Sequence, residues 1–174
     1  MSNKAKAIAE CFSELDLTVL TVTETWLKDG RDIENNAADF EMGTGIAMIH
    51  RGRRERRGGG VAILYKKSAI NLKKLTLNGN KYDILAASGK MQNNTRKVVI
   101  FCIYGPPNMR RSAWDELIEC LVNNIMRIKT EMSEPYVVLT GDFNKHPLDQ
   151  LLLAIPDLKI HSTPRQEETR PSTS

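Results

Sequence analysis

Hydrophobic and polar residues follow two different periods along the chain, and together these periods predict a mixed α/β protein. Apolar residues recur at helical spacing over Ala5–Leu15 and Ser112–Lys129, and a shorter helix is indicated over Pro147–Ile155. Apolar, β-branched runs typical of strands occupy Leu17–Thr23, Met42–Ile49, Val61–Tyr65, Ile70–Leu77, Tyr82–Ala87, Val98–Tyr104 and Tyr136–Thr140.

Turn signals between these segments indicate how the strands connect. Asn78–Asn80 and Gln92–Asn94 carry the residues of antiparallel hairpin turns. Gly105–Pro107 ends the strand before it, because proline has no N–H for a β-ladder. In the long helix, Ser112 is the predicted N-cap and Trp114 is a predicted core residue.

The composition describes an ordinary globular protein. The chain has 174 residues, which favours one domain, and 41% hydrophobic with 26% charged residues excludes wholesale disorder. A net charge of +4 is compatible with a polyanionic partner but does not demonstrate one. Three cysteines without CxxC spacing argue against a disulfide scaffold or a cysteine-rich zinc site. No membrane span or signal peptide is recognised, so we expect an intracellular protein, with the nucleus as one candidate compartment.

Three polar side chains stand at the ends of apolar strands. Glu24 follows the first strand, and Asp142 and Asn144 follow the last one. Carboxylate and amide oxygens at such positions can hold Mg²⁺ or orient a water that attacks a phosphate. Taken singly, Glu24 is more simply an exposed loop acid, and Gly141–Asn144 is more simply a turn.

Four short motifs occur together in a fixed order and give these residues more weight. They are Thr-Glu-Thr-Trp-Leu at 23–27, Gly-Gly-Gly-Val-Ala-Ile at 58–63, Ile-Tyr-Gly-Pro-Pro at 103–107 and Gly-Asp-Phe-Asn at 141–144. This set resembles the endonuclease/exonuclease/phosphatase superfamily, most closely the apurinic-type endonuclease domain of LINE-type non-LTR retrotransposons. The resemblance implies an α/β fold in which two mixed β-sheets pack face to face with helices outside, a four-layer sandwich. It assigns 1–168 to this domain and leaves 169–174 as a disordered tail.

The resemblance also implies a role for each matched residue. Glu24 corresponds to the glutamate that binds Mg²⁺, or Mn²⁺ in its place. Asp142 corresponds to the aspartate that orients and activates the attacking water, Asn144 to the amide that grips the scissile phosphate, and Tyr104 to the tyrosine that hydrogen-bonds it. The implied reaction is hydrolysis of a DNA phosphodiester that leaves a 3′ hydroxyl, which in a retrotransposon would prime reverse transcription.

The chain departs from the family pattern at both ends. Family members begin with a strand that ends in a metal-placing asparagine and finish with Ser-Asp-His, and this chain has neither. Losing members of a catalytic set costs several powers of ten in rate, so the expected chain is a truncated endonuclease domain with weak or no activity. His50, His146 and His161 are predicted surface residues that do not replace the missing histidine. We infer no obligate protein partner, but a missing inner strand predicts self-association through uncovered sheet surface.

Two other functions stay open, as do two local interpretations. The chain could be a non-catalytic nucleic-acid-binding module, or a phosphoesterase that acts on a substrate other than DNA. The basic run Arg51–Arg57 fits a phosphate contact and a solvated loop or nuclear-localisation patch equally well. Trp26 fits a DNA contact or an amphipathic anchor for its own loop.

Overall fold

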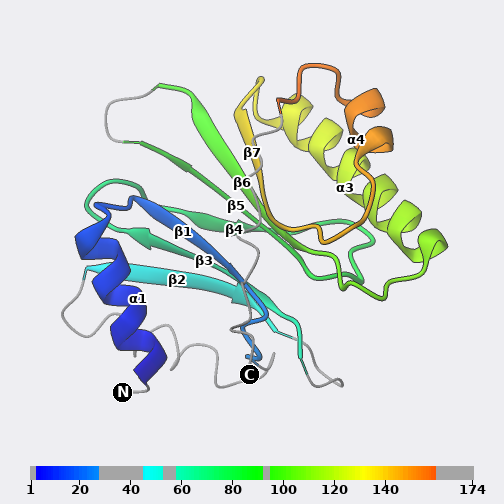
Figure 1. Ribbon diagram of the computed structural model, residues 1–174. Helices are drawn as coiled ribbons and strands as arrows, with labels where there is room; N and C mark the ends of the chain where they lie inside the picture. Colours follow the sequence, from blue (N-terminus) through cyan, green and yellow to red (C-terminus); the bar gives the residue numbers. More distant parts are fainter. Residues whose placement is uncertain (1–2, 28–44, 53–57, 92–94, 160–174) are drawn as a thin grey trace, which may run out of the picture.

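Two β-sheets pack face to face, with helices on both outer sides, in the computed structural model of the protein (Figure 1). The structure describes residues 3–27, 45–52, 58–91 and 95–159. The elements of these ranges are α1 (Asn3–Glu14), β1 (Val19–Thr23), β2 (Ile46–Arg51), β3 (Val61–Lys66), β4 (Lys73–Leu75), β5 (Ile84–Lys90), β6 (Lys97–Tyr104), α3 (Arg111–Glu131), β7 (Tyr136–Asp142) and α4 (Asp149–Ala154). The predicted four-layer α/β sandwich is confirmed.

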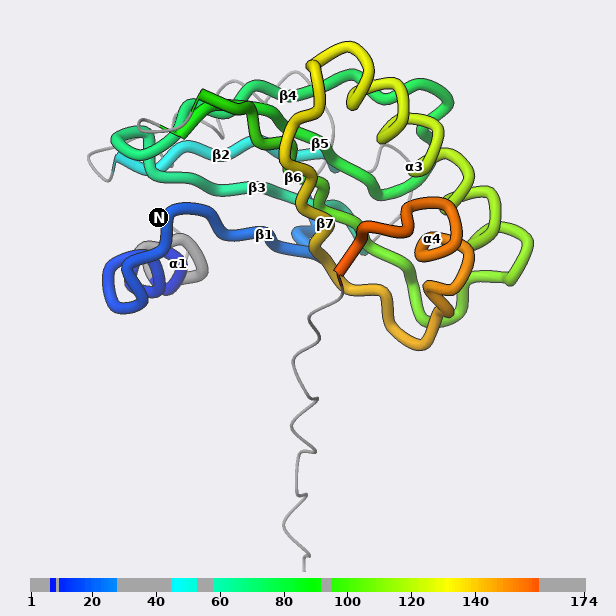
Figure 2. The backbone as a smooth tube through the Cα atoms, turned by 90° about the horizontal axis from the view of Figure 1, so that it is seen from above, coloured from blue at the N-terminus to red at the C-terminus, as the bar shows by residue number. Residues whose placement is uncertain are grey.

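The first sheet has the strand order β1-β3-β2, and both pairings are antiparallel. Its central strand β3 is buried on both faces, which explains its uninterrupted apolar run. On the outer face, Phe12 of α1 packs against Ala62 and Leu64 of β3. The helix α1 therefore covers the face of this sheet that points away from the second sheet (Figure 2).

The second sheet has the strand order β4-β5-β6-β7. Its first three strands pair antiparallel, as the hairpin signals predicted, and β7 pairs parallel to β6 after the crossover through α3. The apolar stripe of α3 packs on the outer face of the sheet, where Trp114, Leu117 and Leu121 are fully buried. The prediction that Trp114 lies in the core is confirmed.

Alternation along β6 decides which residues reach the space between the sheets. Phe101 and Ile103 point outward to α3, whereas Ile100, Cys102 and Tyr104 point inward to the first sheet. Burial of the Cys102 side chain raises the pKa of its thiol to about 12, because an ionised sulfur would lose its hydration there. Tyr104, the last residue of β6, is therefore directed toward β1.

Several predicted elements begin or end elsewhere. The strand predicted over Ile70–Leu77 is only Lys73–Leu75, and Ile70 makes a single isolated bridge to Met91. Beyond the strand, the Asn78 N–H donates to Asn124 Oδ1 of α3 instead of to a β-ladder. The predicted N-cap Ser112 is wrong. The helix starts one residue earlier, at Arg111, its N-cap Arg110 makes no side-chain cap bond, and Ser112 lies within the first turn.

Other predictions fall partly outside the described residues. The strand predicted over Met42–Ile49 is described only from Gly45 onward, where β2 runs to Arg51. Residues 53–57 of the basic run, the predicted turn at 92–94 and the tail from residue 160 lie outside as well. In the ranges that are described, Cys11, Cys102 and Cys120 are free thiols, and no helix is long and apolar enough to cross a membrane.

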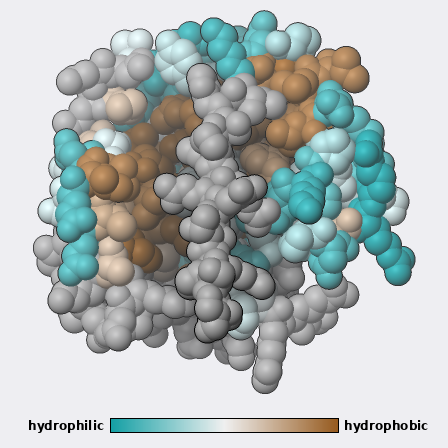
Figure 3. Space-filling model, in the orientation of Figure 1, coloured by the Kyte–Doolittle hydropathy of each residue, from teal (hydrophilic) through white to brown (hydrophobic). Residues whose placement is uncertain are grey.

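One flank of the sandwich presents two strand edges without a partner in the described part of the chain. There, β1 is paired only with β3 and β7 only with β6, and the two strands lie side by side, with Thr21 Oγ1 2.9 Å from Thr140 Oγ1 (Figure 2). On β7, Tyr136 is 49% and Val138 46% exposed. Apolar residues are visible on this face of the molecule in Figure 3.

We expect the chain to self-associate through this flank, because free backbone groups beside apolar side chains are a template for further strand pairing. Light scattering behind size-exclusion chromatography should show a mass that rises with protein concentration. Val138→Lys should shift the protein toward the monomer, since a charge at a strand edge opposes pairing, whereas Leu153→Lys on α4 should not. A monomer whose melting temperature is independent of concentration would contradict the expectation.

Candidate functional site

Three strand ends meet at one end of the sandwich. In the parallel pair β6–β7, Tyr104 and Asp142 are register partners and the last residues of their strands. Register partners project from the same face of a sheet, so both side chains point toward the first sheet. Glu24 follows the last residue of β1 on that sheet. The predicted site residues Glu24, Tyr104 and Asp142 therefore belong to strand ends that lie together.

Hydrogen bonds across the sheets hold the end of β1 in this position. The Tyr104 hydroxyl donates to Glu24 Oε1, which links the two predicted residues directly. Further along, the Cys102 thiol lies 3.7 Å from the carbonyl oxygen of Val22, and Thr21 contacts Thr140. The Tyr104 bond orients one carboxylate oxygen of Glu24.

Asp142 and Asn144 form a tight local structure after β7. The Asn144 N–H donates to Asp142 Oδ1 at 2.9 Å, an Asx-type turn, and the Asn144 side chain donates to the Gly105 carbonyl at 2.9 Å. The Gly105 N–H in turn donates to the Asp142 carbonyl at 2.9 Å. These bonds join the loops after β6 and β7 and leave one amide N–H of Asn144 for a ligand.

Trp114 packs against the loop after β7 and holds it in place; we call this set of contacts the brace. The indole stacks on His146 with ring centroids 4.5 Å apart, meets Phe143 edge to face, and donates from Nε1 to the Pro147 carbonyl at 2.9 Å. His146 Nε2 also lies 2.7 Å from the Pro106 carbonyl oxygen. Sequence reasoning missed this brace, although Trp114 at the start of the long helix was the available signal.

The prediction that all three histidines are surface residues is wrong for His50. His50 is buried, because β2 continues to Arg51 and pairs His50 with Ala62 inside the sheet. His146 is half-buried against Trp114. The remaining histidine, His161, lies outside the described residues. Neither described histidine bonds to Glu24 or Asp142 in this structure.

The triglycine segment fixes the backbone that follows β1, a connection that the sequence did not reveal. The Thr25 N–H donates to the Gly60 carbonyl at 3.3 Å, and the Trp26 N–H donates to the Gly59 carbonyl at 2.9 Å. A Cβ on Gly60 would lie 2.6 Å from Thr25 Oγ1, so only glycine allows this approach. Two of the four sequence motifs, at 23–27 and 58–63, thus contact each other.

The donor set suits a hard divalent cation that shares its coordination with substrate and water. Glu24 and Asp142 are exposed carboxylates, and Mg²⁺ is often held by one or two carboxylates together with waters and phosphate oxygens. Over residues 3–27, 45–52, 58–91 and 95–159, no three His, Cys, Asp or Glu side chains gather into a metal-binding group. The residues fit an ion held mainly by Glu24, but not a cage made of protein ligands alone.

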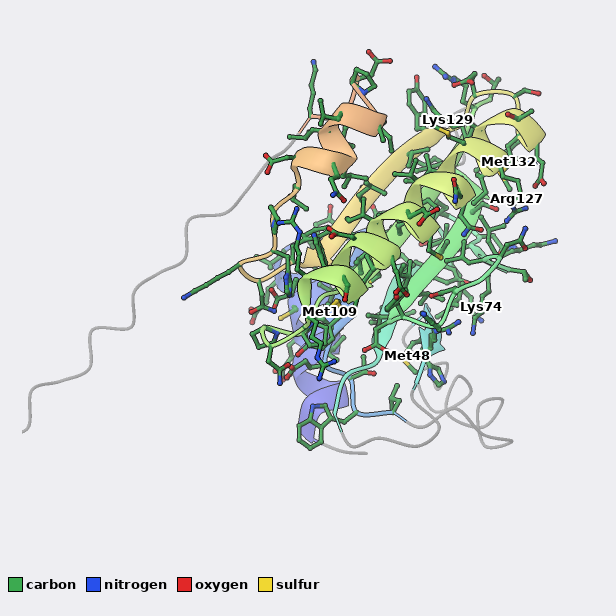
Figure 4. All side chains as sticks on the ribbon, turned by 90° about the vertical axis from the view of Figure 1, so that its right-hand side faces the viewer. Met48, Lys74, Met109, Arg127, Lys129 and Met132 are labelled. Carbon is green, nitrogen blue, oxygen red and sulfur yellow. The ribbon has the colours of Figure 1, made fainter. Side chains whose placement is uncertain are left out.

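A separate pocket of about 430 Å³ lies between the turn after β4 and the exposed side of α3. Its lining includes Asn78, Lys81, Glu116, Cys120 and Arg127, and it contains none of the predicted site residues. Arg127 lies toward the Met132 end of α3, whereas Met109, a few residues beyond Tyr104, marks the other end (Figure 4). This pocket is therefore distinct from the strand-end site.

A family model matches nearly the whole chain. The model described as the Endonuclease/Exonuclease/phosphatase family matches residues 1–172. None of the curated proteins compared with the chain matches it significantly.

Solved structures with this fold differ widely in sequence. A mannosyl-6-phosphatase from Bacteroides thetaiotaomicron has a TM-score of 0.60 at 16% identity, with 86% of this chain and 60% of that chain covered. A humanised zebrafish TDP2 has a TM-score of 0.55 at 12% identity, with 85% of this chain and 58% of that chain covered. A 3′ phosphatase from Neisseria, bound to a product DNA hairpin, has a TM-score of 0.54 at 15% identity, with 81% of this chain and 52% of that chain covered. The chain thus spans little more than half the length of these structures.

Proposed function

Because the chain belongs to the endonuclease/exonuclease/phosphatase family, we propose that it is part of a metal-dependent enzyme that hydrolyses phosphodiester bonds in DNA. Within that family, the residues of its four motifs favour an endonuclease domain of the LINE-type retrotransposon class. The observation that carries the proposal is the convergence of Glu24, Tyr104 and Asp142 at three adjacent strand ends.

Each of these residues has chemistry that suits the reaction. One carboxylate oxygen of Asp142 accepts a proton from a water molecule and so directs the water oxygen at phosphorus. The other carboxylate oxygen of Asp142 accepts from the Asn144 backbone N–H. The free amide N–H of Asn144 donates to a phosphate oxygen. The Tyr104 hydroxyl has a single hydrogen, which it gives to Glu24 in this structure, so it donates to the phosphate only when it turns away from Glu24. Glu24 would hold the divalent cation on which enzymes of this family generally depend, and that cation would neutralise the charge that develops on the phosphate.

DNA is the favoured substrate class for reasons of charge. The chain carries a net charge of +4, and the basic run Arg51–Arg57 adjoins in sequence the triglycine segment that contacts Thr25 and Trp26. Cationic side chains near a phosphate site favour polyanions, because each neutralised phosphate releases counterions. The Neisseria structure of similar fold is a complex with product DNA, which is consistent with this substrate class.

We propose that the chain alone turns over slowly or not at all. Among the described residues no histidine bonds to Glu24 or Asp142, because the His146 ring lies against Trp114 and the Pro106 carbonyl. No third His, Cys, Asp or Glu of the described residues forms a metal-binding group with these two carboxylates. A catalytic set that acts as a unit loses most of its rate when one member is absent. The residues present bind and orient a phosphate better than they activate the leaving group.

The proposal is tested by the nicking of supercoiled plasmid with protein in excess over DNA. We expect slow nicking in Mg²⁺ or Mn²⁺, none in EDTA, and a loss of at least about 100-fold in Glu24→Gln, which removes the carboxylate charge. Glu119→Gln, an exposed carboxylate on α3, is the matched control and should retain the activity. Nicking that survives both EDTA and Glu24→Gln would refute the assignment.

A phosphoesterase that acts on another substrate is the second candidate. The observation in its favour is the mannosyl-6-phosphatase among the structures of similar fold. Hydrolysis of a sugar phosphate that exceeds plasmid nicking, and is lost in Glu24→Gln, would select this function. DNA binding with a steep salt dependence, undiminished by Glu24→Ala and without hydrolysis, would instead select a non-catalytic binding module.

A further inference from the structure

The Trp26 side chain is a large apolar surface left in water beside the candidate site. It is 64% exposed, which leaves the indole accessible to a ligand. The other interpretation that the sequence allowed, an anchor for its own loop, involves residues 28–44, which lie outside the described part of the chain. The other tryptophan of the chain, Trp114, is only 1% exposed. The contrast shows that the fold buries one indole and presents the other.

The backbone under Trp26 is held in an unusual conformation. Trp26 has a φ of +57° and Glu24 a φ of +53°, in the left-handed region that residues other than glycine seldom adopt. Such conformations persist where the surrounding structure enforces them, and they gather at ligand sites. Glu24 and Trp26 are two of the six described non-glycine residues with positive φ, and Asn144 at the same site is a third.

Specific contacts enforce this conformation. The Trp26 N–H donates to the Gly59 carbonyl at 2.9 Å and the Thr25 N–H to the Gly60 carbonyl at 3.3 Å. On the other side, the Glu24 carboxylate accepts from Tyr104. The segment that carries the indole is therefore fixed at both ends, which limits the entropy lost when a ligand contacts it.

The position of Trp26 relative to Glu24 is restricted by the chain itself. Two peptide units separate their Cα atoms, which places these at most about 7 Å apart. A phosphate bound by the Asn144 amide beside Glu24 belongs to a nucleotide whose base lies within reach of a neighbouring aromatic ring. The flat indole matches the face of a nucleobase, and this stacking tolerates any base because every base has a π-face.

We propose that Trp26 is the stacking platform for a nucleobase next to the phosphate that the Asn144 amide binds beside Glu24 and Asp142. This inference rests on the proposed function and adds a specific ligand contact to it. The platform binds single-stranded or unstacked nucleotides without reading their sequence, while the phosphate contacts set the position along the strand.

Tryptophan fluorescence measures this contact without any need for turnover. Because the chain has only Trp26 and the buried Trp114, quenching by an added ligand reports on Trp26. Oligothymidylate should quench the emission saturably, whereas an abasic oligomer of equal length and charge should bind about tenfold more weakly and quench little. Trp26→Ala should lose the same tenfold in affinity for oligothymidylate, measured by fluorescence anisotropy of a labelled strand.

Two control variants make the result specific. Trp26→Phe keeps a ring and should recover part of the affinity, which a merely structural role for Trp26 would not predict. Leu153→Ala removes a more exposed apolar side chain, on α4, and should change neither quenching nor affinity. Far-ultraviolet circular dichroism of each variant should match that of the parent chain, because the substituted side chains are exposed.

The failure of this inference differs from the failure of the proposed function. Equal affinity for the abasic oligomer and for oligothymidylate, unchanged in Trp26→Ala, would overturn the stacking role and leave a phosphate-binding site in place. Quenching by mannose 6-phosphate but not by oligothymidylate would assign the platform to a sugar and overturn it as well. If no oligomer binds at low salt, both the inference and the DNA assignment fall together.

Discussion

Replacing Gly141 by alanine is expected to destabilise the folded chain by about 4 kcal/mol, at the upper end of single-residue effects. Gly141 has a φ of +141°, and a Cβ there would lie 1.9 Å from the carbonyl oxygen of Ile103. That oxygen belongs to the backbone of β6, so no side-chain rotation relieves the contact. The end of β7 would have to separate from β6, and Asp142 would move with it.

Gly79→Ala is the matched control for this prediction. Gly79 also has a positive φ, +65°, but a Cβ there would meet nothing within 4 Å. Its substitution should lower the free energy of unfolding only by the conformational strain of a left-handed alanine, about 1 kcal/mol. Urea unfolding curves of the two variants compare their free energies of unfolding, provided that the dependence of this free energy on urea concentration has the same slope in both. Equal midpoints for both variants would show that β7 and β6 do not approach as closely as described.

Trp114→Ala is the second change with a large expected effect, a loss of about 3–5 kcal/mol in the free energy of unfolding. The indole is fully buried among the residues of α3 and the second sheet, and it also braces Phe143 and His146. The cavity left behind would destabilise the core, and the loop that carries Asn144 would lose its support. Thermal and urea unfolding should both detect the loss.

Trp26→Ala is the natural control, because it removes the same side chain from an exposed position. It should change the free energy of unfolding by no more than about 0.5 kcal/mol. Trp114→Phe tests the brace more narrowly, since it keeps an aromatic ring and removes the N–H that donates to the Pro147 carbonyl. A Trp114→Ala variant as stable as Trp26→Ala would contradict the packing of this core.

Gly141 and Trp114 support the candidate site from opposite sides of one loop. Gly141 allows β7 to stay paired with β6 up to Asp142, and Trp114 holds the residues that follow Asn144. Both act on the backbone and not on a ligand. The orientation of Asp142 and Asn144 is thus coupled to the stability of the second sheet, and variants at either position should weaken phosphate binding as well as folding.

The sequence by itself predicted the fold class and most of the elements, and its motifs proposed the residues of the candidate site. Apolar periodicity located α3 and the strands because helical and extended backbones place side chains on one face at fixed spacings. The motifs around Glu24, Tyr104 and Asp142 were recognisable because they are local, and they stand where apolar strands end.

Only the tertiary structure decided which side chains are buried and which contact each other. Ser112 had the residue type of an N-cap, yet the helix starts at Arg111. His50 beside a basic run is buried because β2 continues alongside β3. Trp26 is exposed although it follows a strand, and its backbone is held by the distant triglycine segment. Burial and close approach arise from pairing between residues far apart in the chain, whereas periodicity reports only on neighbours within a few residues of one another.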